Sequence, residues 1–139
     1  MKQNIKLYLI IFSLFILIDI PMILYINGSM YKNLFAKINN GPMTSNIYTM
    51  IAGLLVYLIL AFGIYYFILS PNMNDNINYM DIFIKGAILG FVVYGVYDLT
   101  NLLSINNFTL KEGIVDIIWG TSLSGTISVL SIFLLNQFS

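Results

Sequence analysis

The chain contains no cysteine, no histidine and no arginine. Without cysteine it can form neither a disulfide nor a thiolate metal site. Without histidine it cannot build the usual zinc sites, a Ser-His triad or a histidine proton switch. Its six basic and six acidic residues cancel, which removes the basic patch that nucleic-acid binding needs. We therefore expect no nucleic-acid partner, no metal ligand set and no cofactor.

Charged side chains of either sign are scarce. They make up 9% of the 139 residues, whereas 59% are hydrophobic. A soluble domain has about 25% charged residues, so this chain lacks the polar surface to cover a water-facing globule. The composition predicts that its solvent is a lipid bilayer.

Four apolar segments are long enough to cross a bilayer, because a span needs about 20 residues. Turn-forming residues separate them. The connections are too short for a second domain, so we expect a single integral membrane domain over residues 1–139. The predicted fold is an all-α, four-transmembrane-helix bundle, up-down-up-down. The expected spans are 7–26, 47–69, 82–103 and 114–135, and the breaks include Asn27-Gly28, Asn39-Asn40-Gly41-Pro42, Ser70-Pro71-Asn72 and Asn106-Asn107.

Lys2 and Lys6 precede the first apolar run, as in a signal peptide. The run is longer than a typical signal sequence, and no small-x-small cleavage site follows it before Tyr31, so we expect a retained span. The lysines are divided equally between the two membrane sides and do not set the orientation. Because the first span often dominates, we expect both termini on the cytoplasmic side of the cell membrane.

The longest connection, residues 27–46, contains a helical pattern. Tyr31, Leu34, Phe35 and Ile38 recur at i, i+3, i+4 and i+7. This spacing predicts a short amphipathic helix at the membrane interface. An ordered loop is the alternative.

Three aspartates lie inside the apolar spans. A carboxylate in hydrocarbon is costly unless it is protonated, hydrated or paired, so such residues usually mark a functional interior. Following the chain back and forth across the membrane puts Asp19, Asp98 and Asp116 within about 10 Å of the same membrane boundary, at 1.5 Å per residue. We expect them to form one acidic, polar pocket near that face.

Small and polar residues form matching stripes on the third and fourth spans. Gly86 and Gly90 allow a neighbouring backbone to approach closely, and Gly120, Ser124 and Ser128 supply a complementary face. Packing these stripes together brings Asp98 and Asp116 into proximity. The expected surroundings of this pair are Tyr97, Thr100 and Asn101 as hydrogen-bond partners, and Trp119 as a pocket wall or an interfacial anchor.

Each acidic position has a functional and a structural interpretation. Asp98 and Asp116 either handle a proton, a cation or a polar head group, or they hold helices together through a protonated carboxyl. Beside Asp19, Pro21 either frees a backbone carbonyl for a site or simply begins the exit from the bilayer. Gly86, Gly90 and the serines are expected to serve helix packing.

The segments Leu17-Ile18-Asp19, Met30-Tyr31, Tyr97-Asp98-Leu99-Thr100-Asn101-Leu102 and Asp116-Ile117-Ile118-Trp119-Gly120-Thr121 resemble one bacterial-type family of predicted membrane proteins, domain of unknown function 2177. The resemblance covers essentially the whole chain. It implies a four-span membrane protein in which these residues are the marked ones, and it implies no activity. Family members usually carry a tryptophan shortly after the first aspartate, where this chain has Pro21-Met22.

Three functions remain open at this level. The first is a non-enzymatic membrane protein whose pocket binds or passes a proton, a cation or a small polar head group. The second is an intramembrane enzyme with an aspartate pair, since Tyr97-Asp98 is similar to the Tyr-Asp of intramembrane aspartyl proteases. Their Gly-x-Gly-Asp motif, however, reads Gly113-Ile114-Val115-Asp116 here. The third is an accessory subunit that assembles with itself or with a membrane partner.

Overall fold

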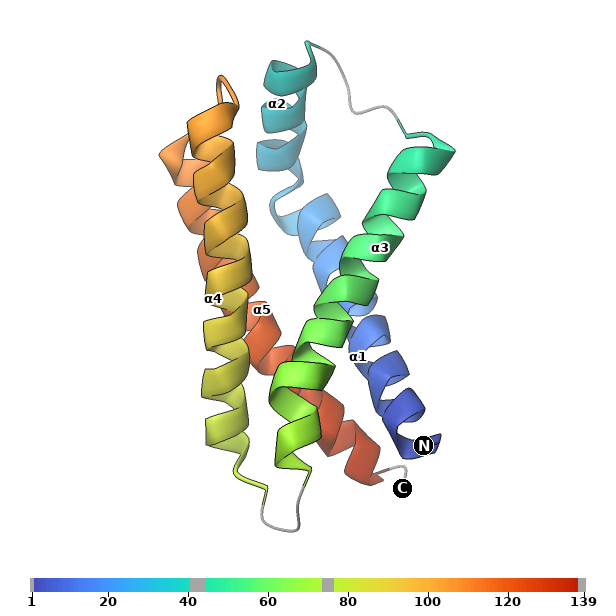
Figure 1. Ribbon diagram of the computed structural model, residues 1–139. Coiled ribbons are helices and arrows are strands. Elements are labelled where there is room, and N and C mark those ends of the chain that lie inside the picture. The colour runs from blue at the N-terminus through green and yellow to red at the C-terminus, as the bar shows by residue number, and fades with distance from the viewer. Residues whose placement is uncertain (1, 41–44, 74–76, 138–139) are drawn as a thin grey trace.

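The computed structural model describes residues 2–40, 45–73 and 77–137. Within them the protein is all-α, and the predicted bundle of four apolar spans with a short helix between the first two is confirmed (Figure 1). The predicted turn residues Gly41 and Pro42 lie outside the described residues. The elements are α1 (Lys2–Pro21), η1 (Met22–Ile26), α2 (Gly28–Asn39), α3 (Ile47–Gly63), η2 (Ile64–Leu69), η3 (Ser70–Asn72), α4 (Tyr79–Ser104) and α5 (Leu110–Gln137).

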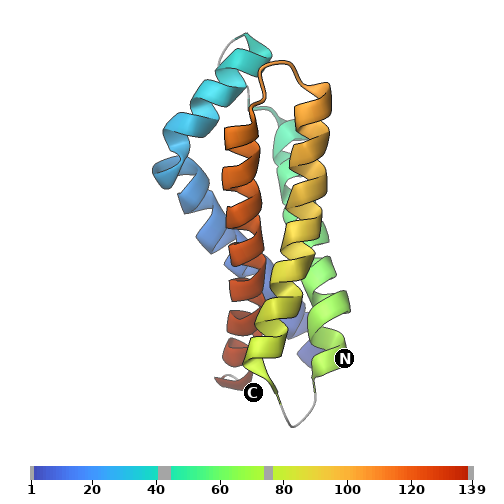
Figure 2. The same ribbon diagram turned by 90° about the vertical axis from the view of Figure 1, so that its left-hand side faces the viewer.

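The spans alternate in direction, so both ends of the described chain lie at one end of the bundle (Figures 1 and 2). We call this the termini end, and the opposite end, which carries α2 and the α4–α5 connection, the cavity end. The helix predicted between the first two spans is present as α2. Its one buried apolar side chain is Leu34, so the amphipathic face predicted from the spacing turns toward the protein.

Side-chain caps set where the later spans begin. Asn46 and Thr49 form a reciprocal capping box at the start of α3. The Asn78 side chain accepts hydrogen bonds from the Met80 and Asp81 amides at the start of α4. These caps satisfy amides that have no partner inside the helix.

The first span changes its winding beside Asp19. Proline cannot donate a backbone hydrogen bond, and after Pro21 the chain continues as the π-helical turn η1, closed by a bond from the Asn27 amide to the Met22 carbonyl at 3.0 Å. The helix therefore widens for five residues before the chain turns into α2. Single π-helical turns within α-helices are frequent at functional sites.

The apolar core lies toward the termini end. Leu7, Ile11 and Phe15 are fully buried at steps of four along α1, and they pack with residues of η2 and of the second half of α5. Asp19 is the next member of the same four-residue series, which explains why it faces inward. At the cavity end, by contrast, α3 leans away from the other helices (Figure 1), and residues 47–56 are all exposed.

Helices α4 and α5 pack the most closely. A Cβ added to Gly90 would lie 2.5 Å from the Gly120 carbonyl oxygen, and one added to Gly86 would lie 2.3 Å from Ser128 Oγ. The ring of Tyr94 occupies the space beside Gly120 in the same way. The two predicted stripes therefore meet, and this contact fixes the position of Asp98 relative to α5.

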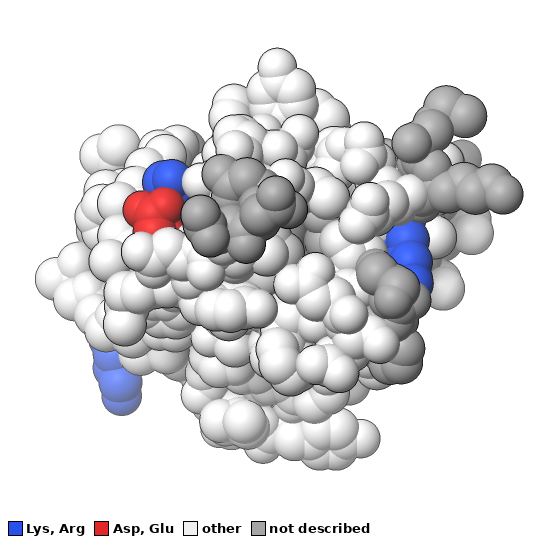
Figure 3. All heavy atoms as spheres, turned by 90° about the horizontal axis from the view of Figure 1, so that it is seen from below, with Lys and Arg blue, Asp and Glu red and all other residues white. Residues whose placement is uncertain are grey.

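The outer surface is apolar, as lipid contact requires. Long apolar side chains such as Leu17, Ile59 and Leu103 are exposed along the spans. This suits the hydrocarbon layer, where no water can satisfy a polar group. Seen from the termini end, the surface shows few charged atoms (Figure 3). At this end Lys85 pairs with Asp81 at 2.6 Å.

Candidate functional site

A cavity of about 920 Å³ opens between the helices at the cavity end. All four spans, α2 and the α4–α5 connection contribute to its lining. Its polar residues are Asp19, Tyr31, Asn39, Thr49, Tyr57, Tyr94, Tyr97, Asp98, Asn101, Glu112 and Asp116. Because α3 leans outward where α4 and α5 stay together, the space lies within the upper half of the bundle.

The three intramembrane aspartates line this one cavity. Asp98 lies six residues before the end of α4, about 9 Å in at the rise of a helix. Asp116 lies six residues after the start of α5, at the same depth. The apolar pattern predicts a later start for α5 than the structure has, because the helix begins with the polar residues that precede the apolar run.

Asp19 is held by two donors from different helices. Trp119 Nε1 on α5 donates to Asp19 Oδ1 at 2.7 Å, and the Tyr57 hydroxyl on α3 donates to Oδ2 at 3.0 Å. The residue is only 6% exposed. Both carboxyl oxygens thus have a partner, and Asp19 connects three spans.

Asp116 is bound by the helix that follows the first span. The Tyr31 hydroxyl on α2 donates to Asp116 Oδ1 at 2.5 Å. Burial, and secondly this bond to the aspartate, raise the pKa of Tyr31 well above its usual value. Tyr31 therefore remains a donor throughout the physiological pH range.

Asp98 is different, because one of its oxygens is left without a donor. The residue is 2% exposed, and its Oδ2 has no hydrogen-bond partner among the described residues. Its carboxyl group faces that of Asp116 within hydrogen-bonding reach. Two carboxyl groups can bond to each other only if one carries the proton. An unpaired buried oxygen is costly, and the partner that the described residues offer to this carboxyl is a proton shared with Asp116.

The start of α5 brings the two acids together. Thr109 and Glu112 form a cap in which Glu112 Oε2 accepts from the Thr109 amide at 2.7 Å and also from the Thr109 hydroxyl. Directly after it, Gly113 lies against Asp98, since a Cβ added there would be 3.5 Å from Asp98 Cβ. Glu112 lines the cavity but is occupied in this cap.

The predicted neighbours of the aspartates are only partly in the cavity. Tyr97 and Asn101 line it, but neither donates to the unpaired Asp98 oxygen. Thr100 does not line it and is exposed on another face of α4. Trp119 does not line it either, and instead donates a hydrogen bond to Asp19.

The predicted pocket residues do not include Tyr57, Tyr31 or Glu112. A tyrosine in the middle of an apolar span is a usable signal, because a buried hydroxyl normally has a partner, and Tyr57 is such a residue. The Thr109-x-x-Glu112 spacing is a recognisable helix start. For Tyr31, no local pattern indicates that α2 folds back over the fourth span.

Among the described residues, no three acidic side chains lie close enough to hold a metal ion together. Asp19 is engaged by Trp119 and Tyr57, while Asp98 and Asp116 face each other. Asp19 and Asp116 are therefore hydrogen-bond acceptors at the cavity, bound by Trp119, Tyr57 and Tyr31.

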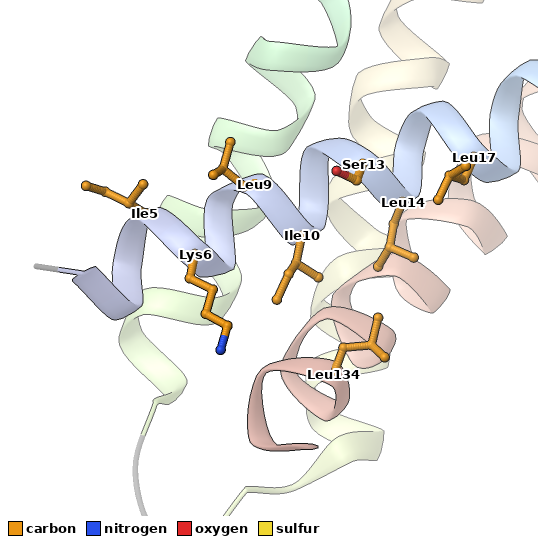
Figure 4. A pocket seen from close by; sticks show the side chains of 8 residues that line it. All are labelled: Ile5, Lys6, Leu9, Ile10, Ser13, Leu14, Leu17 and Leu134. Atoms are coloured by element: carbon orange, nitrogen blue, oxygen red, sulfur yellow. The ribbon is translucent and has the colours of Figure 1, made fainter. Parts of the chain in front are cut away.

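A second hollow, of about 460 Å³, lies on the outside of the bundle near the N-terminus. Figure 4 shows that its side chains come from α1 except for Leu134, and that Lys6 reaches along its edge. Its other lining residues are Ile5, Leu9, Ile10, Ser13, Leu14 and Leu17. Its lining contains no acid and is mostly apolar, as expected of a face that contacts lipid chains.

Comparison with known proteins gives one match. The family model described as "Predicted membrane protein (DUF2177)" matches residues 4–133. No curated protein and no solved structure matches the chain.

Proposed function

The chain belongs to the family of predicted membrane proteins DUF2177, and we propose that it is a binding protein of the bilayer. In this proposal the cavity takes up a small molecule through a cationic or hydrogen-bond-donating group, which contacts the aspartates near one membrane face. The observation that carries the proposal is a cavity of about 920 Å³ that is lined by the three intramembrane aspartates together with apolar side chains.

The size of the cavity favours a molecule over a bare ion. Ligand sites usually enclose about 300–1,000 Å³, and the cavity volume of about 920 Å³ is within that range. A proton or a dehydrated cation needs far less space.

The charge of the lining favours a cationic group. Three aspartates face the cavity, and none of the described lining residues is a lysine. An ammonium group has three donors and no acceptor, so it complements a lining that presents carboxyl groups and, among the described residues, no lysine. Charge-assisted hydrogen bonds of this kind are the strong ones.

Ethanolamine is a suitable first probe, with purified protein in lipid nanodiscs. We expect Asp98→Asn to weaken its binding by about 10- to 100-fold, since a hydrogen bond to a charged group contributes about 1.5–3 kcal/mol. Asp81→Asn, on the termini end, is the matched control and should leave binding unchanged. Binding that is equal in wild type and Asp98→Asn, measured by calorimetry, contradicts the proposal.

The facing carboxyls favour a second candidate, acid/base catalysis by the Asp98–Asp116 pair. One protonated and one ionised carboxyl within hydrogen-bonding reach can act as general acid and general base. This candidate requires that a bound compound be converted, and that both Asp98→Asn and Asp116→Asn abolish conversion. Recovery of an unaltered ligand from the wild-type protein, by mass spectrometry, excludes it for that ligand.

A further inference from the structure

The cavity has an apolar wall as well as a polar one. Leu34, Phe35 and Ile38 line it from α2, and Val56 and Leu60 line it from α3. A small hydrophilic molecule would leave these side chains without apolar contact. A molecule that carries a hydrocarbon chain would cover them.

The mouth of the cavity opens through the side of the bundle. Val56, Val93 and Tyr97 line the cavity and are nevertheless 53%, 39% and 60% exposed. These residues lie on spans, where the surroundings are lipid. A Cβ added to Gly53, beside the same opening, would meet nothing within 4 Å.

The opening extends below the acids, toward the middle of the bilayer. Val93 lies eleven residues before the end of α4, or about 16 Å, compared with about 9 Å for Asp98. A molecule in the hydrocarbon layer thus reaches the mouth before it reaches the carboxyls. Its head group would then move up to Asp98 while its chain stays beside α2 and α3.

From these observations we infer that the ligand is a cationic amphiphile, a hydrocarbon chain with an amine head group, which enters from the bilayer between α3 and α4. The inference rests on the proposed binding function and adds the class of ligand and its route. Phosphate-bearing lipids do not fit, because their phosphate would lie among three aspartates without a lysine in the described lining.

The test uses dodecylamine with a photoreactive diazirine in its chain, in phosphatidylcholine nanodiscs. We expect the probe to label peptides that contain Leu34, Phe35 or Leu60, and unlabelled dodecylamine to compete for this labelling. Asp98→Asn should reduce labelling about tenfold or more, by the loss of a charged hydrogen bond. The same chain with a hydroxyl head group should label these peptides weakly.

A pair of matched variants tests the route. Val56→Trp fills the mouth, whereas Leu55→Trp places the same ring on the same exposed helix outside the cavity; the native side chains are 53% and 50% exposed. Neither substitution disturbs a packed core, so both proteins should fold. Val56→Trp should abolish the labelling and Leu55→Trp should leave it intact.

Each other outcome overturns the inference in a recognisable way. Full competition by ethanolamine, together with unchanged labelling in Val56→Trp, means that a head group alone binds; the proposed function then stands and the amphiphile does not. Labelling that is independent of Asp98 overturns both the amphiphile inference and the proposed binding function. Competition by phosphatidylethanolamine as strong as that by dodecylamine overturns the requirement for a net positive head. Cross-links between two copies at this face, without probe labelling, mean that a second copy fills the gap.

Discussion

At the scale of single residues, the three intramembrane aspartates have different environments. Asp19 has both oxygens bonded, by Trp119 and Tyr57. Asp98 has an oxygen without a donor among the described residues. The same residue type in the same kind of span therefore has two environments, and the difference lies in which neighbours reach it.

Tyr31 permits a prediction about alkaline pH. Its pKa is raised in the folded protein by burial and by Asp116. A group whose folded pKa is raised contributes stability that is complete below its unfolded value, about 10 for tyrosine, and that is lost as the pH rises further. We expect Tyr31→Phe to lower the free energy of unfolding by about 1–3 kcal/mol at neutral pH, since it leaves Asp116 short of a donor.

Above pH 10 the stability curves of the wild type and Tyr31→Phe should converge, because only the wild type loses the contribution of this phenol. Unfolding in detergent, followed by circular dichroism from about pH 8 to about pH 12, measures both curves on either side of the reference pKa of tyrosine, about 10. Tyr48→Phe, which removes an exposed phenol, is the control for general alkaline damage. A constant difference between the curves across this range contradicts the assignment.

At the scale of elements, α4 and α5 form a rigid pair, and the first half of α3 stands away from it. The pair is close because glycines and serines let the backbones approach. Helix α3, in contrast, is exposed on every face over residues 47–56. Asp98 and Asp116 are thus held on the rigid pair, whereas α3 contributes the opposite wall, with Tyr57 bonded to Asp19 and residues 47–56 exposed.

Gly90 and Gly95 provide a matched test of the rigid pair. A methyl group at Gly90 would approach the Gly120 carbonyl, a backbone atom that cannot turn aside, whereas one at Gly95 would meet nothing within 4 Å. We expect Gly90→Ala to destabilise the protein by about 1–3 kcal/mol, as overpacking usually does. Gly95→Ala should cause no loss, because alanine favours the helix. Equal midpoints of thermal unfolding for the two variants would refute the close contact.

At the scale of the whole molecule, packing is uneven along the membrane normal. The apolar core fills the termini end, and the cavity with its three aspartates occupies the other end. The protein therefore has one end that supplies stability and one that has room for a ligand.

Because the chain has no cysteine, single-cysteine variants can determine its orientation without background. We expect cytoplasmic termini, so a membrane-impermeant maleimide should label Asn106→Cys in intact cells and Asn4→Cys only after permeabilisation. Gln137→Cys should behave like Asn4→Cys, since the spans are even in number. All three positions are exposed. The opposite pattern would reverse the orientation, and a difference between the two terminal variants would contradict the four-span topology.

Much of this protein follows from local sequence features. Spans of apolar residues separated by turns predict the four helices, since each span must satisfy its backbone internally in lipid. Helical periodicity predicts α2 and the packing stripes, and the depth of each aspartate in its span predicts that the three lie at a similar level. These properties depend on residues within a few helical turns of one another, and for that reason the sequence alone is enough to predict them.

Tertiary structure alone decided which partners each acid has. The contacts Trp119–Asp19, Tyr57–Asp19 and Tyr31–Asp116 join residues 100, 38 and 85 positions apart, and no helical period relates such residues. The outward lean of α3, which opens the cavity, is likewise a result of how whole helices fit together. Periodicity specifies which face of a helix is polar, whereas the packing of the other helices specifies what that face meets.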